Sequence, residues 1–158
     1  MLTRLKQFAA LPAPDQGTFI LAWLLLGWMR VAILTVSFRK LAASLVLHQD
    51  VVAAAPLCPA QCQRAVRIGW LVASAARCTP WQSRCLIQVL VVQRLLARCA
   101  IPGQFCLGVV RENAGGAPRA GLSAHAWVQC GNVIVNGGAG HERFRVLSTY
   151  RWGVRHPA

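Results

Sequence analysis

The sequence predicts an α+β fold, in which a buried helix packs against an antiparallel sheet and follows an N-terminal helical segment. Residues 85–99 place apolar side chains in nearly every direction around a helix, which is typical of a helix buried on most sides. Residues 104–110 and 123–130 change to a strand-like pattern, and the Gly131-Asn132 pair that follows is a hairpin signal. A helix followed by hairpin-connected strands is typical of α+β architecture.

The N-terminal part of the chain predicts a helix with its apolar body over residues 19–36 and Asp15 as its cap. This apolar stretch approaches the length of a membrane span. Arg30 lies inside it, however, and a charged residue within a span costs about 2.5–3.5 kcal/mol on the insertion scale. We therefore expect residues 1–55 to form a helical segment packed on the core, or lying at a membrane interface, ahead of a main domain at residues 56–158.

A second helix is predicted over residues 61–77, after an Ala/Pro-rich linker at residues 51–59. Two starting points are open for the third helix. If Ser83 is its N-cap, Cys85 lies in the first turn. If Thr79 is its N-cap, with proline at the first helical position and glutamine completing a capping box, Cys85 lies one turn further in.

The charge of the chain is one-sided. Its 158 residues include 17 Lys and Arg against 4 Asp and Glu, a formal net charge of +13. Such a field attracts nucleic acid, anionic lipid or an acidic protein. Because the basic residues are spread singly, without a run of five like charges, we expect an acidic protein partner and no nucleic acid. A content of 56% hydrophobic residues argues against intrinsic disorder and indicates that partners or a membrane cover part of the surface.

The chain contains seven cysteines and opens without a recognisable signal peptide and cleavage site. We therefore expect a reducing, cytoplasmic location, with a peripheral membrane contact as a further expectation. Cys58 and Cys62 resemble half of a zinc site, but a second close Cys/His pair is missing from the sequence. Burial as small hydrophobic residues explains them more simply, and we expect no metal and no other cofactor.

Cys85 and His125 are the candidates for cysteine-based chemistry. Peptide cleavage by a cysteine needs a thiolate, a nearby imidazole and a group that orients the imidazole. A helix N-terminus favours the thiolate through its unpaired N–H groups and its dipole. Either residue taken singly is more often a packing residue. Their order, with a cysteine opening a buried helix, a histidine within a strand and a polar residue on the next strand, is that of papain-like and transglutaminase-like sites.

Two segments carry the most specific motifs, Trp81-Gln-Ser-Arg-Cys85-Leu and Ala124-His-Ala-Trp-Val. Together with residues 5–40, they resemble the stand-alone lasso-peptide leader peptidases, which are transglutaminase-like proteins. The resemblance covers almost the whole chain. It implies that residues 56–158 form a transglutaminase-like catalytic core, with Cys85 as the nucleophile and His125 as the general base. Trp127 resembles the tryptophan that accompanies this histidine, although ordinary packing explains it equally well.

The resemblance also implies what the protein acts on and with. The substrate would be a ribosomally made lasso precursor peptide, from which the leader is removed. A small leader-binding protein would present the leader, and an asparagine-synthetase-like macrolactam synthetase would close the ring on the freed amino terminus.

The third member of the site departs from the family pattern. Relatives commonly place an aspartate on the strand after the histidine, whereas no Asp or Glu lies between His125 and Glu142 here. Asn136 is the candidate, because an amide orients the imidazole in Cys-His-Asn proteases. A two-residue turn at residues 131–132 would pair Trp127 with Asn136 and put His125 one diagonal step away on the same face. The backbone N–H of Cys85 is the expected oxyanion donor, with Gln82 as a second candidate.

Two other functions stay open at this point. One is a non-catalytic interaction scaffold of the same maturation complex, which would keep the packing without an effective triad. The other is an acyl-transferring amidase of transglutaminase-like fold, which would use the same dyad on a different acceptor. Analogy of fold does not separate hydrolysis from transfer.

Overall fold

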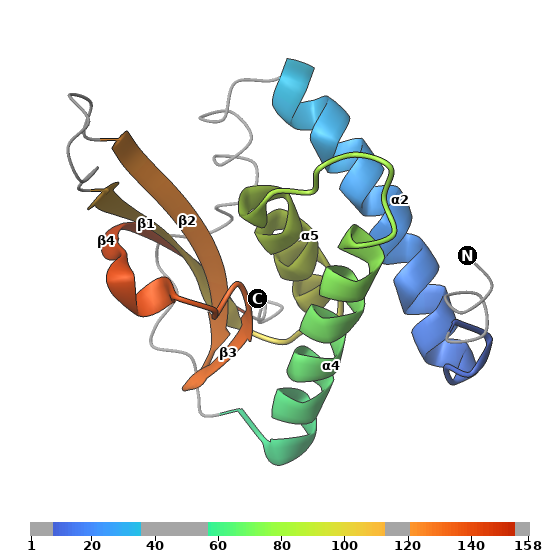
Figure 1. Ribbon diagram of the computed structural model, residues 1–158. Coiled ribbons are helices and arrows are strands. Elements are labelled where there is room, and N and C mark those ends of the chain that lie inside the picture. The colour runs from blue at the N-terminus through green and yellow to red at the C-terminus, as the bar shows by residue number, and fades with distance from the viewer. Residues whose placement is uncertain (1–7, 36–56, 113–120, 154–158) are drawn as a thin grey trace.

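The computed structural model describes residues 8–35, 57–112 and 121–153. Helices cover one side of a four-stranded antiparallel sheet, so the predicted α+β fold is confirmed (Figure 1). In chain order the elements are α2 (Ala13–Thr35), α4 (Pro59–Ala76), α5 (Cys85–Arg98), β1 (Gly103–Glu112), β2 (Gly121–Cys130), β3 (Val133–Asn136), the 3-10 helix η1 (His141–Arg143) and β4 (Arg145–Trp152).

The sheet has the strand order β3-β2-β1-β4, with every neighbouring pair antiparallel. The three strands expected from the sequence are present, but β4 is an additional strand that the sequence did not predict. Its residues are mostly exposed or half-buried, and it pairs with β1 at the edge of the sheet. An exposed edge strand carries little apolar alternation, which explains why its sequence gave no clear strand signal.

The core lies between the sheet and the helices, and α5 is its central element. Most of α5 is buried, as its apolar pattern predicted, and Leu90 and Leu96 are fully covered. The sheet contributes Phe105, Ala126 and Val128 to the same cluster. α5 is therefore anchored in the core along most of its length.

α4 approaches β3 so closely that its backbone lies against the strand. A Cβ atom added at Gly69 would overlap the backbone carbonyl of Val135. Backbone atoms cannot rotate away as the end of a side chain can. Glycine at this position is thus what allows the helix to reach the sheet.

α2 begins at Ala13, so Asp15 lies inside its first turn and is not the cap that the sequence suggested. The Asp15 carboxylate instead binds the Arg67 guanidinium of α4 at 2.7 Å. Ala22 and Leu26 are buried on the inner side of the helix. Residues 36–56, including the expected boundary at residue 55 and most of the expected linker, lie outside the described residues.

Candidate functional site

Cys85 is the first residue of α5, and Arg84 is the N-cap with φ −62° and ψ 162°. Cys85 therefore lies in the first turn, although the cap is Arg84 and not Ser83. Thr79 does not start the helix, because α5 begins only at Cys85 and the Thr79 hydroxyl lies 2.8 Å from Ala76 O and 2.9 Å from Trp81 O. The N–H groups of a first helical turn have no partner within the helix, so the half-buried Cys85 lies at the electropositive end of α5.

The chain just before Cys85 is held by α2. Arg30 Nη1 donates a hydrogen bond to Gln82 O at 3.1 Å. The Trp23 and Trp81 rings pack with their centroids 5.7 Å apart. Arg30, which argued against a membrane span, thus binds the segment that leads into Cys85. The Gln82 side chain is exposed, and among the described residues it makes no hydrogen bond that would give it a role at the sulfur.

His125 lies in the middle of β2, and its Nε2 is 2.7 Å from Gly137 O. A carbonyl oxygen only accepts hydrogen bonds, so Nε2 carries the proton and Nδ1 is the unprotonated nitrogen of the neutral ring. The Phe144 ring lies 5.0 Å from the imidazole and the Trp127 ring 6.1 Å from it, between centroids. The ring is therefore fixed with its basic nitrogen at Nδ1.

The hairpin between β2 and β3 differs from the expected register. Cys130 pairs with Val133 as predicted, but the register then shifts and Asn136 pairs with Val128. The expected pairing of Asn136 with Trp127 is wrong, because β3 contains one extra residue opposite this part of β2. Asn136 is 8% exposed. Among the described residues, no hydrogen bond joins its side chain to His125.

Gly137 takes the position on His125 that was expected for Asn136. Its φ of +72° lies in the left-handed region, and an added Cβ would lie 2.5 Å from Ala126 O. Both facts require glycine here. Gly137 has no side chain to offer, and its backbone carbonyl is the group that binds the imidazole.

Cys85 and His125 are not in contact in this structure. Cys85 packs against the core cluster, to which Ala126 and Val128 of β2 also belong. His125 alternates with these two residues along the strand and so projects from the opposite face of the sheet. Within the part of the chain that the structure describes, no hydrogen bond connects the Cys85 sulfur with the His125 ring.

A second histidine, which the sequence argument missed, lies beside His125. His141 Nδ1 donates to Gly138 O at 2.6 Å, and its ring packs on Trp127 with centroids 5.6 Å apart. Two histidines therefore bind the successive carbonyls of Gly137 and Gly138. In the sequence, the signal that could have identified His141 is its place directly after a glycine-rich run.

A comparison with protein families identifies the domain. The family model of the transglutaminase-like superfamily matches residues 32–149. The chain belongs to this superfamily. No curated protein and no solved structure matches the chain.

The transglutaminase-like superfamily includes cysteine peptidases, and both Cys85 and His125 lie within the matched residues. The matched residues include α5 and strands β1 to β3, and they contain only the last turn of α2. Most of α2 is thus additional to the part of the chain that the superfamily explains. The match does not distinguish hydrolysis from acyl transfer.

The other cysteines of this transglutaminase-like chain have different surroundings. Burial and, to a lesser extent, the nearby Cys62 together raise the pKa of the Cys130 thiol to about 12. Cys130 therefore stays a thiol at neutral pH and is a poor nucleophile. Cys58 is exposed, so burial does not explain it as expected. In residues 8–35, 57–112 and 121–153, no three His, Cys, Asp or Glu side chains gather as metal ligands would.

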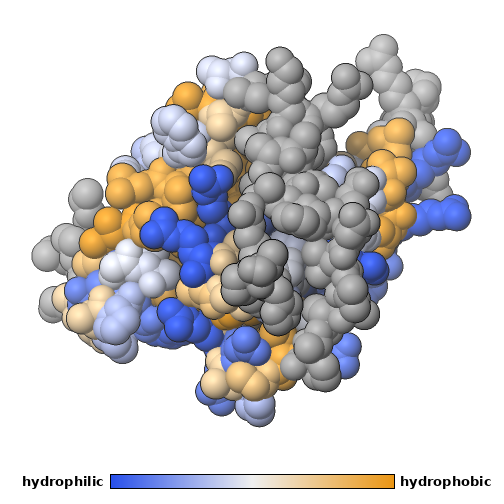
Figure 2. All heavy atoms as spheres, turned by 180° about the vertical axis from the view of Figure 1, so that it is seen from behind, coloured by the Kyte–Doolittle hydropathy of each residue, from blue (hydrophilic) through white to orange (hydrophobic). Residues whose placement is uncertain are grey.

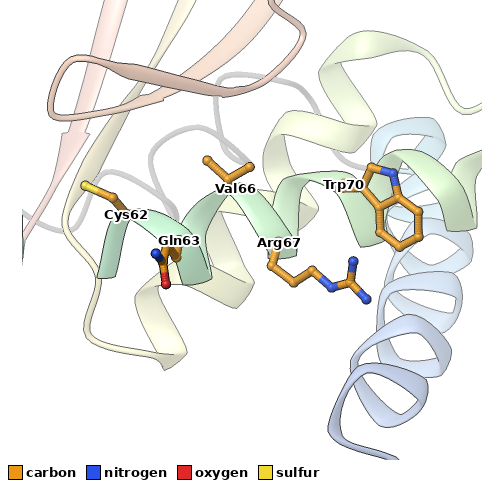
Figure 3. A pocket seen from close by; sticks show the side chains of 5 residues that line it. All are labelled: Cys62, Gln63, Val66, Arg67 and Trp70. Atoms are coloured by element: carbon orange, nitrogen blue, oxygen red, sulfur yellow. The ribbon is translucent and has the colours of Figure 1, made fainter. Parts of the chain in front are cut away.

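A shallow pocket of about 500 Å³ lies on the outer side of α4, away from the predicted site residues. Figure 3 shows its lining side chains along that helix. The Arg67 guanidinium lies 4.6 Å from the Trp70 ring centroid and is also bound by Asp15. Because Arg67 is engaged twice within the protein, this pocket offers no unpaired charge for a ligand.

Proposed function

We propose that this chain is a cysteine peptidase that removes the leader from a lasso precursor peptide. Cys85 is the nucleophile and His125 the general base. The observation that carries the proposal is the position of Cys85 as the first residue of the buried helix α5, inside the residues that match the transglutaminase-like superfamily. The substrate class comes from the sequence resemblance to the leader peptidases.

The proposed reaction follows from the two side chains. His125 Nδ1 takes the proton of the Cys85 thiol, and the sulfur attacks the carbonyl carbon at the end of the leader. The backbone N–H of Cys85 stabilises the oxyanion of the tetrahedral intermediate. The intermediate collapses to a thioester as the imidazolium gives its proton to the leaving amine. Water then hydrolyses the thioester, which frees the leader and restores the thiol.

This mechanism requires the first turn of α5 and the His125 ring to come within hydrogen-bonding reach. Because His125 projects from the face of the sheet opposite the core, this approach needs a rearrangement of β2 and not only the tightening of a long hydrogen bond. We propose that precursor binding brings Cys85 and His125 together. The free protein would then be nearly inactive, which suits an enzyme that must act only on a presented precursor.

Two groups compete for the role of orienting His125 in this mechanism. Gly137 O already binds Nε2 at 2.7 Å, whereas the buried amide of Asn136 makes no hydrogen bond to the ring among the described residues. The existing contact favours the Gly137 carbonyl. A carbonyl fixes the tautomer and the ring direction as an amide oxygen does, but neither stabilises the imidazolium as strongly as a carboxylate.

The proposed partners are a small leader-binding protein and an asparagine-synthetase-like macrolactam synthetase, in the cytoplasm. The net charge of +13 supports an acidic partner surface. We expect the leader-binding protein to speed cleavage of the precursor by about tenfold or more, because it raises the effective concentration of the precursor at the site. Mass spectrometry of the precursor over time measures the two rates.

Added salt should slow the partnered reaction, because screening weakens attraction between exposed charges. The matched control is the same reaction with a leader-free peptide that the partner does not bind, whose rate should respond little to the partner. Equal rates with and without the partner would contradict the role given to it. That result would leave the peptidase activity itself intact.

The separation of Cys85 and His125 favours a second candidate, a non-catalytic scaffold of the same complex. In that case His125 serves only to hold Gly137 at the end of the β2–β3 hairpin. The product distinguishes an acyl-transferring amidase from the peptidase and from the scaffold, since transfer joins the acyl group to an amine instead of to water.

A further inference from the structure

α2 turns a stripe of large apolar side chains toward the solvent. Their spacing of three or four residues keeps them on one face of the helix. Each of them is at least half exposed, from 50% for the first to 74% for the last. The stripe consists of Ile20, Leu24, Trp28, Val31 and Leu34.

The opposite face of α2 packs on the rest of the protein, and this packing limits the orientation in which the helix can contact a membrane. By length and composition, α2 is the one helix in the described ranges that is able to cross a bilayer. Contacts along its length nevertheless bind it to the domain, including the Asp15–Arg67 ion pair at 2.7 Å and the Arg30–Gln82 bond at 3.1 Å. A span would have to break them. A helix held in this way exposes its apolar stripe to a surface that lies parallel to its axis.

The charge of the protein indicates which surface this is. α5 packs next to α2, and its cap Arg84 and its residues Arg94 and Arg98 are exposed. Figure 2 shows apolar atoms along this side of the molecule next to strongly hydrophilic ones. The stripe itself contains no charged side chain, and its tryptophan is of the type that favours membrane interfaces. An exposed apolar stripe on a chain of net charge +13, with exposed arginines on the neighbouring helix, is complementary to an anionic lipid surface.

We propose that α2 docks the protein on an anionic membrane surface, with the stripe from Ile20 to Leu34 inserted among the lipids and the domain held outside. The proposal does not depend on the peptidase activity. It has a consequence for the site, however, because the same helix binds Gln82, three residues before Cys85. A precursor cleaved by this protein would then be processed at the membrane surface.

The test is sedimentation of the full-length protein with vesicles. We expect binding to vesicles of phosphatidylcholine mixed with phosphatidylglycerol, and much weaker binding to pure phosphatidylcholine. The double variant Leu24→Gln, Leu34→Gln should lower the partition coefficient by about tenfold or more, since two largely exposed leucines lose their contact with lipid. High salt should weaken binding of the wild type.

The matched control is the double variant Leu122→Gln, Leu147→Gln, which makes the same change at two leucines of the sheet that are 75% and 71% exposed. It should bind within about twofold of the wild type, because surface changes outside a binding face have small effects. Equal losses in the two double variants would overturn the proposal. Equal binding to both kinds of vesicle would also overturn it, and so would concentration-dependent dimers that the α2 variant abolishes without any vesicle binding.

A second measurement locates the contact. Lipids brominated in their acyl chains should quench part of the tryptophan fluorescence of the bound wild type. Trp28→Phe should still sediment with vesicles but lose most of that quenching. Unchanged quenching in Trp28→Phe would place the lipid contact at another part of the protein and contradict the assignment of this stripe.

Discussion

His125→Gln and His125→Ala are both expected to stop leader removal, with losses of about 10²–10⁴-fold, the usual contribution of a general base. A glutamine amide is able to donate a hydrogen bond to Gly137 O, as His125 Nε2 does, but it cannot take a proton from a thiol. His125→Gln should therefore recover thermal stability relative to His125→Ala without recovering activity. Single-turnover cleavage of the precursor and circular dichroism melting measure the two effects.

Comparing the two His125 variants distinguishes a general base from a residue that only holds the β2–β3 hairpin in place. If His125→Gln recovers both stability and cleavage, His125 only holds the hairpin and the scaffold becomes the better hypothesis. Asn136→Ala is the companion variant. We expect it to stay within a few-fold of the wild type, because a backbone carbonyl already orients the ring. A loss for Asn136→Ala as large as for His125→Gln would return the orienting role to the Asn136 amide.

Gly69→Ala is expected to be among the most damaging single substitutions in this protein. Its methyl group would overlap the backbone carbonyl of Val135, so α4 would have to move away from β3. Forced shifts of packed backbone cost about 3–5 kcal/mol at the severe end of measured substitutions. Because domains are stable by only about 5–15 kcal/mol, a large part of the folded protein's stability would be lost. Urea unfolding measures the free-energy change.

Gly17→Ala provides a matched control, since both glycines lie inside helices. Nothing lies within 4 Å of a Cβ placed at Gly17. Alanine there should stabilise the protein by about 0.5–1 kcal/mol, the difference in helix propensity. A Gly69→Ala variant as stable as Gly17→Ala would show that α4 does not rest on the backbone of β3.

The elements that could be predicted are those that follow from local periodicity. α5 is apolar on nearly all sides because it is buried on nearly all sides, and its place in the fold followed from its sequence. β3 begins at Val133, as the predicted two-residue turn at Gly131-Asn132 requires. β4 was missed because an exposed edge strand has no alternating pattern to detect.

The geometry of the candidate site depended on features that residue types do not encode. One extra residue in β3 moved Asn136 from Trp127 to Val128, and a bulge depends on twist and packing around the hairpin. The partner of His125 is a backbone carbonyl, which every residue possesses and no motif records. The placement of Cys85 in the first turn was left open by the sequence and was decided by the conformation of Arg84.

The proposed leader removal depends on the Cys85 thiol as its nucleophile. The most direct test is mass spectrometry of the precursor after incubation with the leader-binding protein and either the wild type, Cys85→Ala or Cys106→Ala. Cys106 is buried on the sheet, so its variant controls for the loss of a thiol with only modest packing cost. We predict free leader with the wild type and with Cys106→Ala, and an intact precursor with a folded Cys85→Ala. Leader released by Cys85→Ala at the wild-type rate would contradict the claim.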